Sequence, residues 1–211
     1  NCHVGPLMIS TTHWWWIRHA PCVGEQGIIH GQDDVEADLS DSKAIKGLSK
    51  WLPEDGLWLS SNVRRAIETA KAISGGIKPI EIPAFAEQSF GLWNGRRWKE
   101  LSKGESEGFW TNYGEQKAPK GESFRQLLER VTPKIKKMSA ENAGGDLIVV
   151  AHAGTIRAAL ALALDLPLNS ALSMSVSNLS LTKIDAFEEA NPFAWRVEFA
   201  NLTVNINKPS N

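Results

Sequence analysis

The sequence predicts an α/β fold, a three-layer sandwich in which helices cover both faces of a mostly parallel central sheet. Short apolar runs typical of buried strands alternate along the chain with longer segments of helical periodicity. The chain has 211 residues, of which 42% are hydrophobic and 22% charged, which is enough to bury one core. We therefore expect a single domain over residues 1–211, with a flexible N-terminal segment at 1–12.

Strands and helices alternate in the first half of the chain. The expected elements are a strand at 13–17, a helix at 40–52, a strand at 56–60, a helix at 62–74 and a weaker strand at 77–82. The helix at 62–74 has a clear pattern, because Val63, Ile67 and Ala70 recur at helical spacing. Asn62, directly before this pattern, is a suitable N-cap.

A stretch rich in glycine, aromatic and charged residues follows at 85–120. It shows little periodicity, and we expect it to form a loop-rich cap over the functional site at the strand ends. Helix resumes at Ser123, where Ser123 and Gln126 match a capping box. The remaining expected elements are this helix, closed by Gly144-Gly145, a buried strand at 146–152, a helix at 155–166, and strand-like runs at 172–184 and 194–206.

Composition argues against several classes of partner. The chain carries 23 Lys and Arg against 24 Asp and Glu, so no basic excess indicates nucleic-acid binding. No apolar stretch approaches the roughly 18 residues typical of a membrane span, so we expect no membrane partner. Cys2 and Cys22 form neither a CxxC motif nor a disulfide framework, which fits a reducing compartment, and we expect a cytoplasmic protein.

Three of the predicted strands deliver charged or titratable groups at their carboxyl ends. These groups are Arg18 and His19 after the first strand, Arg64 and Arg65 after the second, and His152 with the helix-opening Gly154 after the fourth. In open α/β sheets, ligands bind beyond the carboxyl ends of the strands, where helix N-termini also point. We therefore expect these residues to meet in one site.

Arginines, histidines and helix N-termini at one edge are typical of a site for a phosphate dianion. The planar guanidinium binds two phosphate oxygens at once and keeps its charge at every physiological pH. The sequence contains no HExxH motif, no clustered set of carboxylates and no GxxxxGK[ST] phosphate loop. We therefore expect neither a metal nor another cofactor.

The motifs that carry these residues resemble, in order, those of the histidine phosphatase superfamily, which contains the cofactor-dependent phosphoglycerate mutases and many small-molecule phosphatases. The motifs are "IRHA", "SSNVRRAIETA", "AEQSFGLWNG", "PKGESFRQLLERV" and "VVAHAGTIRAAL", spread over most of the chain. The resemblance implies a phosphoglycerate mutase-like fold. The stretch "FGLWNG" is similar to that of phosphatases related to α-ribazole phosphatase and of broad-specificity relatives.

The resemblance also implies a role for each matching residue. His19 matches the histidine that attacks phosphorus, and Arg18 matches the phosphate-binding arginine beside it. Arg65 matches the second phosphate-binding arginine, and His152 the second histidine, which binds the phosphoryl oxygens. Glu87 matches the carboxylic acid that protonates the leaving oxygen. This chemistry is coherent in itself, because a neutral imidazole attacks, arginines stabilise the equatorial oxygens, and the leaving alkoxide needs a proton.

The chain departs from the family at one motif. Many relatives read Arg-His-Gly-x-Thr or Arg-His-Gly-x-Ser, in which the later hydroxyl helps to bind phosphate. Here Ala20 follows the histidine and Cys22 stands where the hydroxyl would be. The stretch at 30–34 could replace that hydroxyl through Gln32 or through backbone amides.

Other residues are alternatives to these assignments. Arg64 could replace Arg65, although the family pattern Arg-Ala-x-x-Thr-Ala fits Arg65. Glu81 is a second glutamate close to Glu87. A solvated, partly packed loop is the favoured interpretation of Arg96-Arg97, over a specificity patch.

We interpret the sequence as a metal-independent phosphomonoester hydrolase that acts on a small phosphorylated metabolite through a phosphohistidine. One alternative is a phosphoglycerate mutase, which would use the same site to move a phosphoryl group. Another is a non-catalytic protein that binds a phosphate ligand. The five residues Arg18, His19, Arg65, Glu87 and His152 argue against that last class, since a binding protein needs neither the acid nor the nucleophile.

Overall fold

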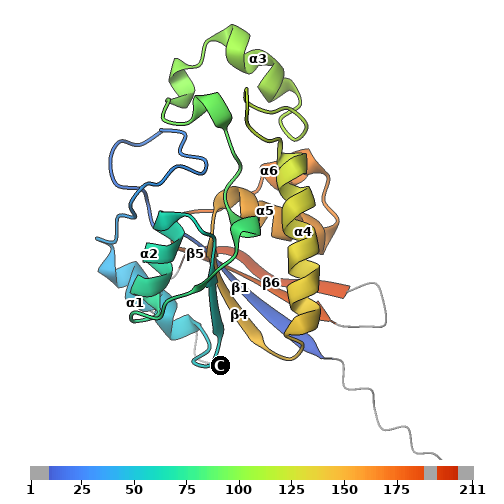
Figure 1. Cartoon of the computed structure of the whole chain (residues 1–211). Coiled ribbons are helices and arrows are strands. Elements are labelled where there is room, and N and C mark those ends of the chain that lie inside the picture. The colour runs from blue at the N-terminus through green and yellow to red at the C-terminus, as the bar shows by residue number, and fades with distance from the viewer. Residues whose placement is uncertain (1–9, 188–193, 204–211) are drawn as a thin grey trace, which may run out of the picture.

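The computed structural model describes residues 10–187 and 194–203, which form one six-stranded sheet with helices on both faces (Figure 1). The strands are β1 (Thr11–Arg18), β2 (Leu57–Ser60), β3 (Ile80–Glu81), β4 (Asp146–Ala151), β5 (Ser180–Phe187) and β6 (Ala194–Thr203). Their order is β3-β2-β4-β1-β5-β6. The first four strands are parallel, β5 is antiparallel to β1, and β6 is antiparallel to β5. The predicted α/β fold with a mostly parallel sheet is confirmed.

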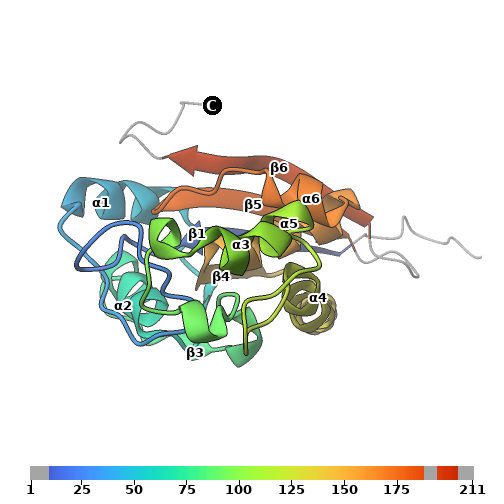
Figure 2. The same cartoon turned by 90° about the horizontal axis from the view of Figure 1, so that it is seen from above.

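Two layers of helices enclose this sheet. The helices are α1 (Ser42–Trp51), α2 (Arg64–Ile73), α3 (Lys103–Thr111), α4 (Phe124–Glu141), α5 (Ala153–Leu164) and α6 (Leu168–Leu172), with short 3₁₀ turns at Pro83–Phe85, Gly91–Trp93 and Trp98–Glu100. One core lies between the sheet and α1 and α2, and a second lies between the sheet and α4 and α5. Figures 1 and 2 show α1 and α2 on one side of the sheet and α4 on the other.

Three consecutive tryptophans are accommodated in β1 because side chains of a strand alternate between its faces. Trp14 and Trp16 are fully buried against the α4 and α5 layer, where their rings stack with centroids 5.2 Å apart. Trp15 points to the other face, donates to Asp146 and lies under the ammonium of Lys183. The aromatic run therefore anchors the central strand to both layers, and this fixes where the strand ends.

The structure corrects several expected boundaries. β1 begins at Thr11, so Thr11 and Thr12 belong to the sheet and not to a flexible N-terminal segment, while residues 1–9 lie outside the described residues. The N-cap of α2 is Val63 and not Asn62, because the helical backbone begins at Arg64, one residue later than the position of Asn62 predicts. The run at 172–184 is a strand only from Ser180, and a short helix, α6, precedes it.

Local signals located α4 well. Its N-cap Ser123 accepts from the amide of Gln126, and the Gln126 side chain accepts from the amide of Ser123, so the predicted capping box is confirmed.

No helix among residues 10–187 and 194–203 is both long and apolar enough to cross a membrane.

A cap lies over the carboxyl ends of the parallel strands, where Figure 1 shows α3 and its flanking segments at the top of the molecule. Figure 2 looks down onto the same edge. The cap has an apolar core of its own: Ile29, Phe90, Trp93, Leu101, Phe109 and Ala118. The loop that contains Ile29 is tied to it by backbone bonds, from the Ile29 amide to the Arg96 carbonyl and from the Gly95 amide to the Ile29 carbonyl. Cap and loop together form a roof over the strand ends.

Candidate active site

Two neighbouring strands deliver the two histidines of the site. His19 and His152 directly follow β1 and β4, which pair in parallel with Arg18 opposite Ala151. The His19 amide donates to the Ala151 carbonyl at 3.0 Å, and the two imidazole centroids lie 5.0 Å apart. Both side chains are buried, at 5% and 0% exposure. The two histidines therefore meet at the carboxyl ends of the strands, where ligands of such sheets bind, as expected.

His19 is oriented for attack through its Nε2 atom. Its Nδ1 lies 2.6 Å from the Ala20 carbonyl oxygen, which accepts only if Nδ1 carries the hydrogen. The lone pair is then on Nε2, which faces Arg65. Burial, and secondly the charge of Arg65, hold the pKa of His19 well below its ordinary value of 6.5. The imidazole is consequently neutral at neutral pH, the form that can act as a nucleophile.

Arg65, in the first turn of α2, is 2% exposed and lies at the centre of the site. Its Nε donates to His19 at 3.2 Å, and its terminal nitrogens donate to the carbonyl oxygens of Gly31 and Asp33 at 2.6 and 3.1 Å. None of these acceptors is charged. Its guanidinium therefore keeps a full positive charge that no carboxylate of the described residues neutralises.

Arg18 contributes a second guanidinium from the last position of β1. One of its terminal nitrogens donates to the Val176 carbonyl at 2.5 Å, and its Nε is buried with no hydrogen-bond partner among the described residues. It too forms no ion pair within the described part of the chain. Burial lowers the pKa of Arg18 and of Arg65, but both remain cationic at neutral pH. A buried and a half-buried cation that line one cavity are typical of a site that binds a dianion.

His152 uses both ring nitrogens within the protein. Its Nδ1 lies 3.2 Å from a terminal nitrogen of Arg65, and its Nε2 lies 2.7 Å from the hydroxyl of Ser61. Since the arginine can only donate, Nδ1 accepts and Nε2 carries the hydrogen. Burial, and secondly His19, lower the pKa of His152 well below 6.5. His152 therefore supports Arg65 and Ser61, and its expected contact with phosphoryl oxygens stays a prediction.

Glu87 reaches the site from the cap and is held at the N-terminus of α5. Its carboxylate accepts from the amide of Gly154 at 3.1 Å and from that of Gln88 at 2.8 Å. Its own carbonyl oxygen accepts from Gln32 and Arg130, both at 2.9 Å. The amide of Gly154, expected to bind phosphate, is therefore engaged by Glu87. A Cβ at this glycine would lie 2.2 Å from the Glu87 carboxylate, which explains why the position has no side chain.

A cavity of about 180 Å³ joins these groups. Its lining consists of Arg18, His19, Cys22, Ile28, Ile29, His30, Gly31, Arg65, Glu87, Phe90 and Trp98. A second cavity of about 340 Å³ shares five of these residues and extends outward to Glu25, Gln26, Gly27 and Asn178. We call them the inner and the outer cavity. The inner one places an imidazole, two cations and a carboxylate around one space.

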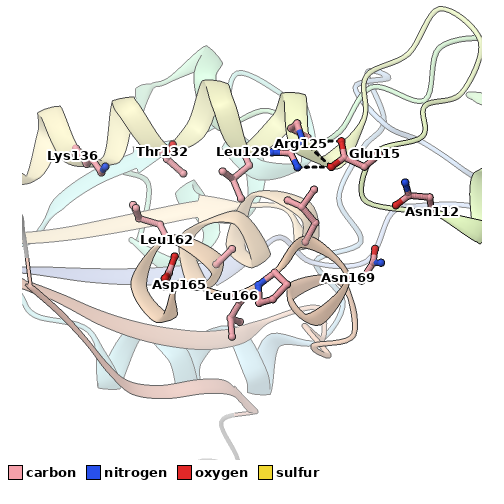
Figure 3. A pocket seen from close by; sticks show the side chains of 13 residues that line it. Asn112, Glu115, Arg125, Leu128, Thr132, Lys136, Leu162, Asp165, Leu166 and Asn169 are labelled. Carbon is pink, nitrogen blue, oxygen red and sulfur yellow. Dashed lines mark hydrogen bonds and ion pairs between the residues drawn. The ribbon is translucent and has the colours of Figure 1, made fainter.

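A larger cavity lies elsewhere, between α4 and the α5–α6 connection (Figure 3). It measures about 610 Å³, and Arg125 and Glu115 form an ion pair at one end of it. Its lining contains none of the residues predicted to act on phosphate. Size alone therefore does not identify the candidate site.

The structure separates the alternatives that the sequence left open. Arg64 is exposed and pairs with Glu36 and Glu68, so it points away from the inner cavity. The side chain of Gln32 is engaged at the Glu87 carbonyl, whereas Cys22 lines both cavities at the position of the usual hydroxyl.

Glu81 and the Arg96-Arg97 pair take no part in the cavity lining. Glu81 is exposed on β3 and lines neither cavity. Arg96 pairs with Glu105, and Arg97 pairs with Glu25 and Glu100. These pairs match the solvated loop that we favoured.

Sequence reasoning missed several supporting residues. Ser61 directly follows β2, so the rule of the strand ends could have assigned it. Arg130 of α4 binds the carbonyl oxygens of Ala84, Ala86 and Glu87 and so fixes the segment that carries the acid. Arg130 lies within the motif PKGESFRQLLERV, but the sequence analysis gave it no role, because local patterning does not show a contact to distant carbonyl oxygens. In the described part of the chain, no three His, Cys, Asp or Glu side chains cluster as metal ligands would.

Comparison with known proteins identifies relatives over most of the chain. The family model described as histidine phosphatase superfamily (branch 1) matches residues 14–201. A metal-independent phosphoserine phosphatase of Arabidopsis thaliana is 33% identical over 155 residues, 67% of this chain and 64% of its own length. An adenosylcobalamin/alpha-ribazole phosphatase of Salmonella typhimurium is 25% identical over 82% of this chain and 90% of its own. Among solved structures, mycobacterial hydrolase 2 superposes with a TM-score of 0.80 at 23% identity, covering 94% of both chains, and this establishes a shared fold.

Proposed function

The chain belongs to the histidine phosphatase superfamily, branch 1, and we propose that it hydrolyses phosphomonoesters of small metabolites through a phosphohistidine at His19. The resemblance inferred from the five motifs is thereby confirmed. The two curated relatives described above are named phosphatases, and a third, from Yersinia enterocolitica, is named a probable phosphoglycerate mutase. One observation carries the proposal. A neutral imidazole, two guanidinium groups without carboxylate partners and one glutamate surround the same small cavity.

In the first step, Nε2 of His19 attacks phosphorus while the bond from phosphorus to the leaving oxygen breaks. Arg18 and Arg65 stabilise the charge on the three equatorial oxygens of the transferring group. Glu87, in its protonated form, gives its proton to the leaving oxygen, so an alcohol departs and a carboxylate remains. The phosphorylated imidazole is a cation whose Nδ1 hydrogen is held by the Ala20 carbonyl, which favours this intermediate.

In the second step, the Glu87 carboxylate takes a proton from water, and the water oxygen attacks phosphorus. The bond between phosphorus and Nε2 breaks, orthophosphate leaves, and His19 and Glu87 return to their starting forms. The same glutamate therefore acts once as acid and once as base. His152 is a positioning residue in this scheme, because its contacts orient Arg65 and Ser61.

Activity should not depend on a metal. The phosphate charge is met by Arg18 and Arg65, so we expect a chelator such as EDTA to leave kcat and KM unchanged. Vanadate can adopt the five-coordinate geometry of the transferring group and should inhibit strongly and competitively. The measurement is p-nitrophenyl phosphate turnover after exhaustive dialysis, with and without EDTA and vanadate. Loss of activity in EDTA that magnesium or zinc restores would contradict the proposal.

The intermediate should react with water and not return its phosphoryl group to a second substrate. The outer cavity opens between exposed residues, Glu25, Gln26 and Gly27, so water has a path to His19. With 3-phosphoglycerate and catalytic 2,3-bisphosphoglycerate, we expect little 2-phosphoglycerate. With a panel of phosphomonoesters, we expect free phosphate. Rapid interconversion of the phosphoglycerates with negligible phosphate release from every substrate would identify a mutase instead.

The two cysteines remain our reason to place this activity in a reducing compartment such as the cytoplasm. The substrate is inferred to be a small phosphorylated metabolite because the inner and outer cavities are small. The phosphoryl group of the substrate must also reach His19, which is 95% buried beneath the cap.

A further inference from the structure

The space around the scissile bond has a distinctive lining on the side of the leaving group. One wall of the inner cavity is apolar and is formed by Ile28, Ile29, Phe90 and Trp98. Phe90 is held by its neighbours in the cap core, with its ring centroid 5.3 Å from that of Trp98 in an edge-to-face contact. Trp98 also stacks on Phe109 at 6.1 Å. The wall is therefore preformed, and it presents aromatic and aliphatic surface to the bound molecule.

The charged residues that line the two cavities also restrict which leaving groups can bind. Arg18 lines both cavities and Arg65 lines the inner one, and the proposed mechanism uses both guanidinium groups to bind the transferring phosphoryl group. The other charged residue of the outer cavity is Glu25, which is paired with Arg97. His30 lines both cavities, but burial, and secondly Arg65, lower its pKa, so it is uncharged at neutral pH. A second anionic group on the substrate would thus find no free cation among the lining residues.

Arg157 of α5 is a further guanidinium close enough to act on Arg18. Its charge is felt at Arg18, where it helps to lower the pKa. Its Nε, however, donates to the Met174 carbonyl at 2.8 Å, and Arg157 is not among the residues that line either cavity. Arg157 therefore acts on Arg18 through its charge, and it lies outside the surface that a leaving group would contact in either cavity.

From this lining we propose that the enzyme selects phosphomonoesters whose leaving group carries an aromatic ring and no carboxylate or other second anion. The ring would lie against Phe90 and Trp98, and polar groups beyond it would meet His30, Gln26 and Asn178, which are uncharged donors and acceptors. Aryl alcohols and nucleosides have this chemistry, whereas phosphoserine and phosphoglycerate carry a carboxylate. The inference rests on the proposed function, because it concerns the substrate of that same site.

The test compares benzyl phosphate with 4-carboxybenzyl phosphate, which differ only by one carboxylate distant from the reacting oxygen. We expect kcat/KM for benzyl phosphate to be higher by about tenfold or more, because the added carboxylate would meet no free cation and would lie near the like charge of Glu25. The corresponding phosphonates, which cannot be hydrolysed, should show the same order of affinity in calorimetric titration. Equal or tighter binding of the carboxylated phosphonate would overturn this inference.

The two proposals fail separately. If the phosphonates show the expected preference but no phosphate ester is turned over, the hydrolase proposal is wrong and the binding preference stands. If both esters are hydrolysed at equal rates, the hydrolase proposal stands and the preference is wrong.

Trp98 provides the matching variant. Trp98→Leu keeps an apolar side chain in the cap but removes the ring, and it should lower kcat/KM for benzyl phosphate about five- to tenfold through KM. Turnover of glycerol 3-phosphate, which has no ring, should stay within about twofold, and Trp98→Phe should restore part of the loss. Trp51→Leu is the control, because that tryptophan of α1 packs against Phe199 and lines neither cavity. An equal loss for both substrates in Trp98→Leu would count against a contact with the ring.

Discussion

Replacing His19 with alanine should lower kcat/KM for every phosphomonoester by more than about 10⁴-fold, the scale of loss when a covalent nucleophile is removed. The reason is geometric. His152 is the imidazole beside it, but it is fully buried and lines neither cavity, so bound phosphorus cannot reach its ring nitrogens. The measurement is steady-state release of phosphate from p-nitrophenyl phosphate and benzyl phosphate.

The matched control is His30→Ala. His30 also lines both cavities, but it is bound neither to Arg65 nor to a carbonyl that would fix its tautomer, and its removal should cost less than about tenfold. Circular dichroism and the thermal midpoint establish that both variants are folded. Turnover by His19→Ala at a rate close to that of the wild type would rule out this nucleophile.

Replacing Glu87 with glutamine should slow turnover of alkyl phosphates by about 10²–10⁴-fold, the usual contribution of general acid–base catalysis. The amide keeps an oxygen that can accept from the amides of Gly154 and Gln88, so the side chain should stay in place. It cannot, however, give a proton to the leaving oxygen or take one from water. The loss in the rate of phosphoryl transfer to His19 should be much smaller for p-nitrophenyl phosphate, whose leaving group needs little protonation.

This dependence on the leaving group is measured with a series of substituted phenyl and benzyl phosphates in a rapid-quench instrument, which separates the two steps. Glu81→Gln is the control, because that glutamate is exposed on β3 and should have no effect on either step. If Glu87→Gln slowed the transfer step equally for every leaving group, the acid would have to be another residue.

The sequence predicts which residues meet at the candidate site, for a physical reason. Arg18, His19 and His152 follow strands whose buried, apolar character is plain from their residues, and parallel neighbours bring their carboxyl ends together. The choice of Arg65 over Arg64 came from a motif, and packing accounts for it: Arg65 is 2% exposed, whereas Arg64 forms ion pairs at the surface.

The remaining features depend on contacts between distant segments. The engagement of Gly154 by Glu87 joins residues 67 positions apart, and the roof forms because Ile29 packs into the cap core beside Phe90. Neither contact follows from local periodicity or capping signals. The role of His152 was likewise assigned from a motif, while its hydrogen bonds to Arg65 and Ser61 depend on the exact depth of its burial.

Trapping of the phosphohistidine tests the central claim most directly. The wild-type enzyme is mixed with excess p-nitrophenyl phosphate labelled in the phosphoryl group, quenched in alkali within milliseconds, digested and sequenced by tandem mass spectrometry. We predict a phosphoryl group on His19 that is stable in base and lost in acid, that forms no more slowly than nitrophenol is released, and that is absent from His19→Ala. A phosphoryl group on another residue, or a burst of nitrophenol without any phosphorylated peptide, would contradict the account.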